Sequence, residues 1–189
     1  MRFFSRRALM IIILSIILLI VSFTAFYQFS IRSNIMKAQL KDIQIKPLEN
    51  SIRSKESLNS YRLSEAEKEE IWNNINEYKK VIYTFEIKNN SWLAYSVHHR
   101  VQPQFSEETN KLLVVSEKNF FFVKNLPTRE SYKTILRAII KTNNQLSDQE
   151  ILDIVSKDRF TIIGNRVGIF SAKPVGDESI TVGPFQRNQ

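Results

Sequence analysis

The stretch LMIIILSIILLIV, residues 9–21, decides how this chain is organised. It lies within residues 8–31, which contain no charged side chain, and it follows Arg2, Arg6 and Arg7. A helix of about 20 mostly apolar residues crosses the roughly 30 Å hydrocarbon core of a bilayer, and it satisfies its own backbone hydrogen bonds there. Residues 9–29 are therefore predicted to form a single transmembrane helix.

A cleaved signal peptide also combines a basic start with an apolar segment. Here the apolar segment exceeds the usual core of about 7–15 residues. The best cleavage site, Ser22-Phe23-Thr24 before Ala25, fits the small-residue pattern poorly, so we expect a retained anchor. The arginines before the helix favour a cytoplasmic tail at residues 1–8 and a domain on the extracytoplasmic side of the cell inner (plasma) membrane.

Small residues recur every seven positions along this helix, at Ala8, Ser15 and Ser22. That spacing places them on one stripe, where a second helix approaches closely and serine hydrogen-bonds across the interface. A chance alignment in a Leu- and Ile-rich segment is the alternative. The stripe is a possible helix–helix seam.

The rest of the chain is mildly basic and has no cysteine. The chain carries 27 Lys and Arg against 19 Asp and Glu; three of the basic residues and none of the acidic ones precede the anchor, which leaves 24 against 19 beyond it. This surplus suits a surface near anionic lipids or an anionic wall polymer. No basic stripe with interleaved aromatic residues is visible, so nucleic-acid binding is not expected. The lack of cysteine excludes disulfides and cysteine-ligated metals.

All four glycines lie in the last quarter of the chain, at Gly164, Gly168, Gly176 and Gly183. Loops that cradle phosphate groups need glycines in tight array, so that the backbone approaches the ligand. This distribution excludes Walker-type and dinucleotide-type sites, and no cofactor is expected.

The outer part is predicted to divide into a tether at residues 30–62, a domain at 63–185 and a polar tail at 186–189. The tether is polar and irregular and is interrupted by Pro47. Helices are expected at 65–80 and 148–156, each opened by a capping box (Ser64 with Glu67, and Ser147 with Glu150). Apolar residues at helical spacing predict a third helix at 129–142.

Alternating or continuous apolar runs predict the strands. Residues 81–88 and 92–99 form an expected hairpin with a three-residue loop, and 159–163 and 167–171 form another, around Gly164-Asn165. The runs 112–115 and 120–123 do not alternate, which is typical of central strands, and 180–182 adds a strand at an edge. The prediction is an α+β domain with a mostly antiparallel sheet and about three helices.

Few residues here suggest chemistry. His98 and His99 are adjacent and would point to opposite faces of a strand, so they cannot share a metal ion without a bulge. Glu107 and Glu108 lie in a polar stretch that is expected to be solvated. No catalytic, cofactor-binding or metal-ligating residue is therefore assigned. The most distinctive cluster, Phe120, Phe121 and Phe122, is either sheet core or a partner surface at a sheet edge.

These features favour a non-enzymatic, single-pass membrane protein whose extracytoplasmic domain contacts other envelope membrane proteins. The expected role is that of an accessory subunit, for example in a secretion, conjugation, pilus or division assembly. A ligand-binding or sensory domain that signals through a membrane partner is the alternative. A hydrolase of wall or lipid, acting through His98, His99, Glu107 or Glu108, has the least support.

Overall fold

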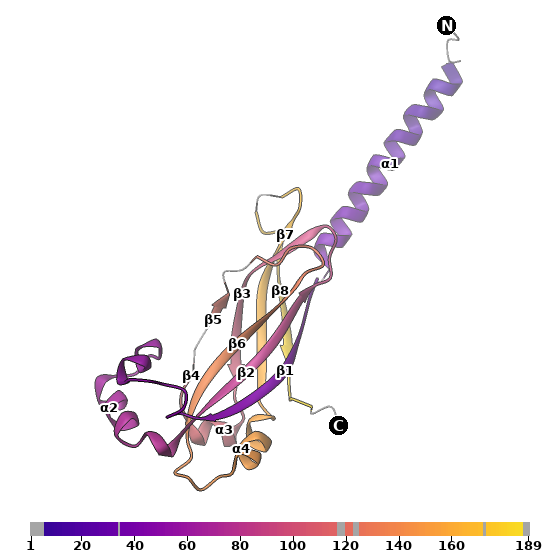
Figure 1. Ribbon diagram of the computed structural model, residues 1–189. Helices are drawn as coiled ribbons and strands as arrows, with labels where there is room; N and C mark the ends of the chain where they lie inside the picture. The colour runs from indigo at the N-terminus through magenta and orange to yellow at the C-terminus, as the bar shows by residue number, and fades with distance from the viewer. Residues whose placement is uncertain (1–5, 34, 117–119, 123–124, 172, 187–189) are drawn as a thin grey trace.

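The computed structural model describes residues 6–33, 35–116, 120–122, 125–171 and 173–186. A long helix, α1 (Arg6–Arg32), projects from an elongated domain that contains two antiparallel four-stranded sheets and short helices (Figure 1). The chain has the predicted mixed α+β fold. Residues 6–30 of α1 are long and apolar enough to span a membrane. Residues 1–5 and 187–189 of the two expected tails lie outside the described residues.

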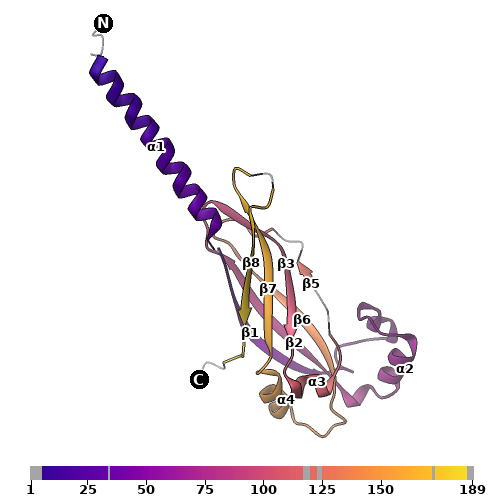
Figure 2. The ribbon, with the colours of Figure 1, turned by 180° about the vertical axis from the view of Figure 1, so that it is seen from behind.

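The eight strands form two sheets whose neighbouring strands all run antiparallel. Sheet A has the order β1 (Met36–Pro47), β2 (Tyr78–Asn89), β6 (Ser131–Lys141), β4 (Leu113–Ser116). Sheet B has the order β5 (Phe120–Phe122), β3 (Ala94–Gln104), β7 (Arg159–Gly168), β8 (Gly176–Val182). Strands β1 and β8 lie side by side, so the two sheets approach each other along that edge (Figure 2).

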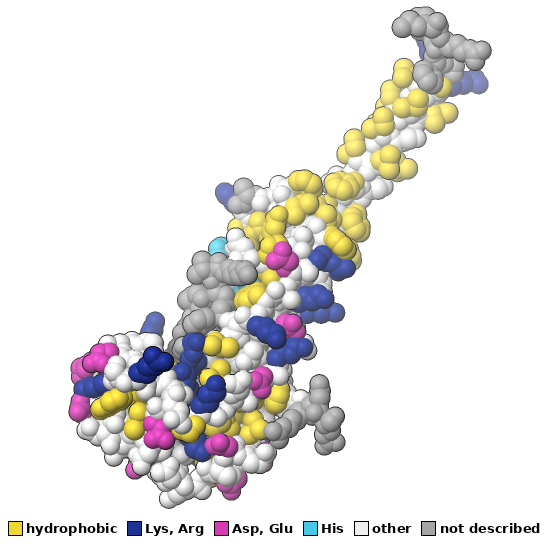
Figure 3. All heavy atoms as spheres, viewed as in Figure 1, with side chains coloured by type: hydrophobic (Ala, Val, Ile, Leu, Met, Phe, Trp, Pro, Cys, Tyr) yellow, Lys and Arg dark blue, Asp and Glu magenta, His cyan; other side chains and the backbone are white. Residues whose placement is uncertain are grey.

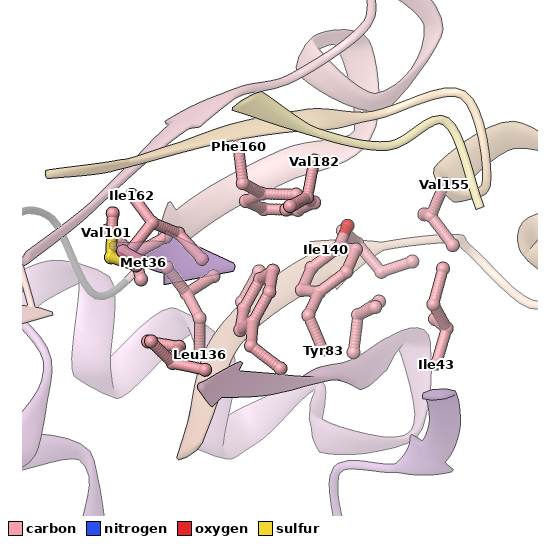
Figure 4. Packing of buried hydrophobic residues seen from close by; sticks show 14 of the residues in the cluster. Met36, Ile43, Tyr83, Val101, Leu136, Ile140, Val155, Phe160, Ile162 and Val182 are labelled. Atoms are coloured by element: carbon pink, nitrogen blue, oxygen red, sulfur yellow. The ribbon is translucent and has the colours of Figure 1, made fainter. Parts of the chain in front are cut away.

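The core lies between the two sheets. Tyr83 and Phe85 of β2 and Leu136 of β6 face Phe160 and Ile162 of β7, and all five are fully buried (Figure 4). The ring centroids of Phe160 lie 4.7 Å from Tyr83 and 4.9 Å from Phe85. Burying large apolar side chains on the inner face of each sheet is the main stabilisation of such a sandwich.

Short helices cover one end of the domain, opposite α1 (Figure 2). The helices α2 (Glu65–Asn73) and α4 (Asp148–Val155) both begin with the predicted capping boxes. Helix α2 is shorter than predicted, since a 3-10 helix, η2 (Ile75–Glu77), leads directly into β2. The helix α3 (Glu107–Leu112) and the 3-10 helix η1 (Lys55–Ser60) were not predicted.

Residues 30–62 do not form the expected tether. Residues Met36–Pro47 are strand β1, which pairs with β2 along almost its whole length. After it, Leu48, Ile52 and Leu58 are buried against the outer face of sheet A, in a cluster with Ile71 and Ile139. The domain therefore begins at residue 35. The bulge between Leu40 and Asp42 breaks the alternation of apolar and polar residues in β1, which weakens the strand signal in the sequence.

Three further predictions about secondary structure are wrong. The helix predicted at 129–142 is replaced by strand β6 (Ser131–Lys141), because pairing with β2 and β4 overrides an apolar stripe at helical spacing. Residues 159–168 form one continuous strand, β7, with Gly164-Asn165 inside it rather than at a turn. Strands β4 and β5 lie at sheet edges, not at the centre, while the edge strand at 180–182 is confirmed as part of β8.

The predicted hairpin of residues 81–88 and 92–99 is also wrong, because β2 and β3 belong to different sheets. The crossing between them is held by the buried side chain of Asn89. Its Nδ2 donates to the carbonyl oxygens of Ala94, Leu126 and Pro127 at 2.8, 3.1 and 3.0 Å, and its Oδ1 accepts from the Ser91 N–H at 2.8 Å. One amide group therefore satisfies four backbone groups at the point where the chain leaves sheet A.

Replacement of Asn89 by alanine tests this account. Asn89→Ala removes the acceptor of the Ser91 N–H and one donor to each of the three carbonyl groups, of which those of Leu126 and Pro127 keep a backbone donor. We therefore expect the free energy of unfolding to fall by about 1–3 kcal/mol. The measurement is urea unfolding of the full chain in mild detergent. The matched control is Asn90→Ala, since Asn90 makes its hydrogen bonds to Ile35 and Arg129 through backbone atoms. Equal losses in the two variants would contradict the assignment.

Candidate functional site

The junction of α1 with the domain is held by two charged side chains from sheet B. Arg166 of β7 donates from Nη1 to the carbonyl oxygens of Arg32 and Ser33, the latter at 2.9 Å. Glu178 of β8 accepts at Oε2 from the backbone N–H groups of Ile35 and Met36, at 3.2 and 3.0 Å. The helix and the first strand are therefore both bound, through their backbones, to the last two strands of the chain.

The signs of these charges match the backbone groups that they meet. The last turn of a helix leaves carbonyl groups without partners and carries partial negative charge, which a guanidinium group satisfies. The N–H groups at the start of β1 lack a strand partner, and a carboxylate accepts from both. Arg166 and Glu178 together cap the end of α1 and the beginning of β1.

The second oxygen of Glu178 enters a buried polar network. It accepts from the hydroxyl of Ser96, whose oxygen lies 2.6 Å from Nε2 of His99. The Nδ1 atom of His99 lies 3.1 Å from the hydroxyl of Tyr132. Ser96, His99 and Glu178 are almost completely buried, and Gly164 makes room for the imidazole ring, because a Cβ atom there would lie 2.7 Å from its Cδ2.

This network contains serine, histidine and glutamate, but not in the order of a hydrolytic triad. In a triad histidine lies between the nucleophile and the acid, whereas here Ser96 lies between His99 and Glu178. The Ser96 hydroxyl donates its hydrogen bond to Glu178, so the Ser96 oxygen accepts from Nε2–H of His99. The other ring nitrogen, Nδ1, then carries no hydrogen and accepts from the Tyr132 hydroxyl. No lone pair of the imidazole faces the serine, and the arrangement favours a structural role.

Burial, and secondarily the neighbouring charge of His98, lowers the pKa of His99 to about 4. Burial also raises the pKa of Tyr132. Both side chains are therefore neutral near pH 7, which agrees with the hydrogen-bond assignment above.

The structure also places the other histidine and the paired glutamates. His98 is exposed and adopts a positive φ of 53°, within a β-bulge between Val97 and Arg100. His98 is exposed and His99 is buried, so the two side chains face opposite sides of the strand, as expected. Because of the bulge, the residue that shares the inward face with His99 is Ser96, and Tyr95 is exposed. Glu107 and Glu108 are exposed on α3 and pair with Lys111 and Lys157. Among the described residues, no group of three or more His, Asp or Glu side chains could hold a metal ion.

A second candidate site is the outer face of sheet A, which gathers basic residues that are scattered in the sequence. Strand pairing sets Lys37 opposite Lys88 and Lys46 opposite Lys80, and it sets Lys133 opposite Glu86. We call this surface the basic face; its basic members are Lys37, Lys41, Lys46, Lys80, Lys88, Lys133 and Arg137. Their side chains lie along the strands between α1 and the end that carries α2 (Figure 3).

The basic face carries only two carboxylates among the described residues, Glu86 and Asp42. Glu86 is bound to Lys41 at 3.1 Å and to Gln39 at 3.0 Å, and these contacts lower its pKa. Residues 48–75 cover only the far end of this sheet, around Tyr78 and Ile139. The rest of the face is open and positively charged.

The residues proposed from the sequence lie elsewhere. Ala8, Ser15 and Ser22 lie on α1, and the helix–helix seam stays a prediction. The backbone of Phe120–Phe122 forms edge strand β5, which pairs with β3 on one side, and a partner surface there also stays a prediction. Sequence reasoning missed Arg166, Ser96 and Glu178, which have no common spacing. It also missed the basic face, whose lysines on β1 and β2 are four to eight positions apart and come to one surface only through strand pairing.

Comparisons with known proteins add little. No protein family matches the chain, and no curated protein is similar to it. Among solved structures, it is similar to a Bordetella pertussis protein assigned the name ApaA, with 10% sequence identity and a TM-score of 0.35. The match covers 77% of this chain and 91% of that chain. A likeness this distant carries no argument about function.

The buried histidine makes stability depend on pH. The pKa of His99 is lower in the folded protein than its ordinary value of 6.5, so the unfolded chain takes up the proton first. The contribution of neutral His99 to the free energy of unfolding is complete above pH 6.5 and is lost as the pH falls towards 4. The loss over this range is about 3 kcal/mol. Unfolding of the full chain at several pH values measures this slope.

Two variants isolate the effect from the titration of carboxylates. His99→Gln removes the histidine component of the slope between pH 6.5 and 4, whereas His98→Gln, at the exposed neighbour, retains it. A slope that persists in His99→Gln, or that disappears in His98→Gln, would show that another group is responsible.

Proposed function

We propose that this chain is a single-pass membrane protein whose domain makes protein–protein contacts in a cell-envelope assembly. In this proposal α1 is a retained anchor in the inner membrane, the N-terminus is cytoplasmic and the domain is extracytoplasmic. The domain acts without catalysis, as an accessory subunit that binds an acidic surface of another envelope protein.

The basic face is the observation that carries the proposal. It is a sheet surface with seven basic side chains against two carboxylates, and five of its lysines are exposed: Lys37, Lys41, Lys46, Lys88 and Lys133. Concentrated charge of one sign steers an oppositely charged partner and sets its orientation. We infer that the partner presents carboxylate groups.

The junction supports this proposal, because it determines where the basic face lies. Arg166 and Glu178 bind α1 and β1 through the backbone, and β1 is itself the outermost strand of the basic face. An anchored helix would therefore present this face at a defined height and orientation relative to the bilayer. The edge strand β5 and the small-residue stripe of α1 are further contact candidates.

Charge reversal on the basic face tests the proposal. In Lys37→Glu/Lys88→Glu/Lys133→Glu, repulsion replaces attraction, so we expect recovery of the partner to fall on the order of tenfold or more. The measurement is in-cell cross-linking of the full-length protein, followed by purification in mild detergent and mass spectrometry.

The control reverses the same amount of charge elsewhere, in Lys55→Glu/Lys111→Glu/Lys157→Glu. These lysines form surface ion pairs with Glu69, Glu107 and Glu108, which contribute little to stability. The control variant should retain the partner. The proposal fails if the wild-type protein is recovered without a cross-linked neighbour, or if both triple variants lose it equally.

The direct coupling of helix and domain favours one second candidate, a sensory domain that signals through a membrane partner. Displacement of β7 or β8 would move the backbone of α1 through Arg166 and that of β1 through Glu178. Replacing residues 9–29 with an unrelated transmembrane helix separates the two functions. Signalling would be abolished by the replacement, whereas assembly through the basic face would be retained.

A further inference from the structure

Two large aromatic side chains are exposed at the end of the domain that meets α1. Trp92, before β3, is 69% exposed, and Phe170, after β7, is 72% exposed. Outside α1, they are the most exposed large hydrophobic residues in the part of the chain that the structure describes. Exposed apolar side chains that gather at one end of a domain are typical of a surface that contacts a membrane or a partner.

Both side chains lie against the last turns of α1. The Phe170 ring lies 5.5 Å from the Tyr27 ring, and the Phe170 N–H donates to the Tyr27 hydroxyl at 3.3 Å. Trp92 lines a groove together with Phe26 and Phe29. The position of the helix in a bilayer therefore determines the depth of Trp92 and Phe170.

The length of α1 gives that depth. At about 1.5 Å per residue, roughly 20 residues cross the hydrocarbon core. Counted from Ala8, directly after the two arginines of α1, the crossing ends near Tyr27. Residues 26–29 thus reach the boundary between acyl chains and headgroups, and Trp92 and Phe170 reach it with them. Tryptophan and tyrosine are the residues that favour this layer.

Cationic residues lie close to these aromatic side chains, in space or in the sequence. The guanidinium group of Arg129 lies 4.1 Å from the centroid of the Trp92 ring. Arg32, the last residue of α1, and Lys173, three residues after Phe170, are exposed, and the acidic residue Glu130 follows Arg129 in the sequence. Phosphate groups of lipids attract arginine and lysine at the membrane surface. Aromatic rings framed by cations match the chemistry of a phospholipid headgroup layer.

We propose that Trp92 and Phe170 insert into the headgroup layer of the bilayer that α1 spans, so that the domain stands directly on the membrane. This inference rests on the proposed membrane anchor. The occupant of the aromatic surface is phospholipid, with Arg129 and Lys173 bound to lipid phosphate. The domain is thereby held at two places, by the junction of α1 and by this lipid contact.

Tryptophan fluorescence tests the inference, because the chain has two tryptophans. Trp72 lies on α2, at the end of the domain opposite α1 (Figure 1), and serves as the internal control. Trp72→Phe leaves only Trp92, and Trp92→Phe leaves only Trp72. Each full-length variant is reconstituted into phosphatidylcholine–phosphatidylglycerol vesicles that contain lipids brominated near the headgroup, and alkaline extraction establishes first that the chain is embedded.

The expected result is a large loss of Trp92 fluorescence in brominated vesicles and none for Trp72. Trp72 is half-buried, so its replacement has the greater risk of disturbing the fold. In that case the wild-type protein and Trp92→Phe suffice: the quenched component is present in the first and absent from the second, and Trp92 is exposed enough to be replaced safely.

Other outcomes overturn one proposal or the other. An embedded chain whose Trp92 is not quenched overturns the lipid contact and leaves the anchor intact. Equal quenching of both tryptophans also overturns it, because it indicates general adsorption of the domain. Protection of Trp92 only when envelope proteins are added identifies a protein occupant instead of lipid. A chain released by alkaline extraction removes the anchor itself.

Discussion

A buried carboxylate at Glu178 is the constraint on which the junction depends. A charged group removed from water must be surrounded by donors. The two oxygens of Glu178 accept from the first N–H groups of β1 and from the hydroxyl of Ser96 on β3, whose oxygen in turn accepts a hydrogen bond from Nε2–H of His99. Elements from both sheets and from the start of the domain therefore converge on one side chain of β8. Arg166 adds the complementary charge at the end of α1, and the orientation of the helix follows from this pair of contacts.

The fold class and the starts of α2 and α4 could be predicted from the sequence, because they depend on local patterns. Capping boxes at Ser64 and Ser147 act within four residues, and an uncharged apolar segment identifies α1 by itself. Strand partners could not be predicted in this way. The β6 segment has apolar residues at helical spacing, and only its position between β2 and β4 makes it a strand. Similarly, alternation alone does not reveal that β2 and β3 lie in different sheets. The hydrogen bonds of the buried Asn89 amide hold the chain where it crosses from one sheet to the other.

The candidate sites were missed for a related reason. Glu178 lies 82 positions from Ser96 and 142 from Met36, and no spacing rule connects them. The lysines of the basic face look dispersed in the sequence, because strands β1, β2 and β6 are separated by long segments. Antiparallel pairing brings them to one surface. The surface around Trp92 and Phe170 and the basic face differ in chemistry. The first combines aromatic rings with cations at the α1 end, and the second is a set of lysines that extends along the sheet towards α2.

The long separation between Ile35 and Glu178 also orders events during synthesis. The segment that follows α1 is the first part of the domain to leave the ribosome, but its hydrogen-bond acceptor belongs to the last strand. The helix would thus enter the membrane long before the domain can lock onto it, since contacts distant in the sequence form late. A chain that stops before β8 retains the apolar helix and Arg166 but lacks the carboxylate that binds the start of β1. The first strand of the domain is therefore held in place only after β8 has been synthesised.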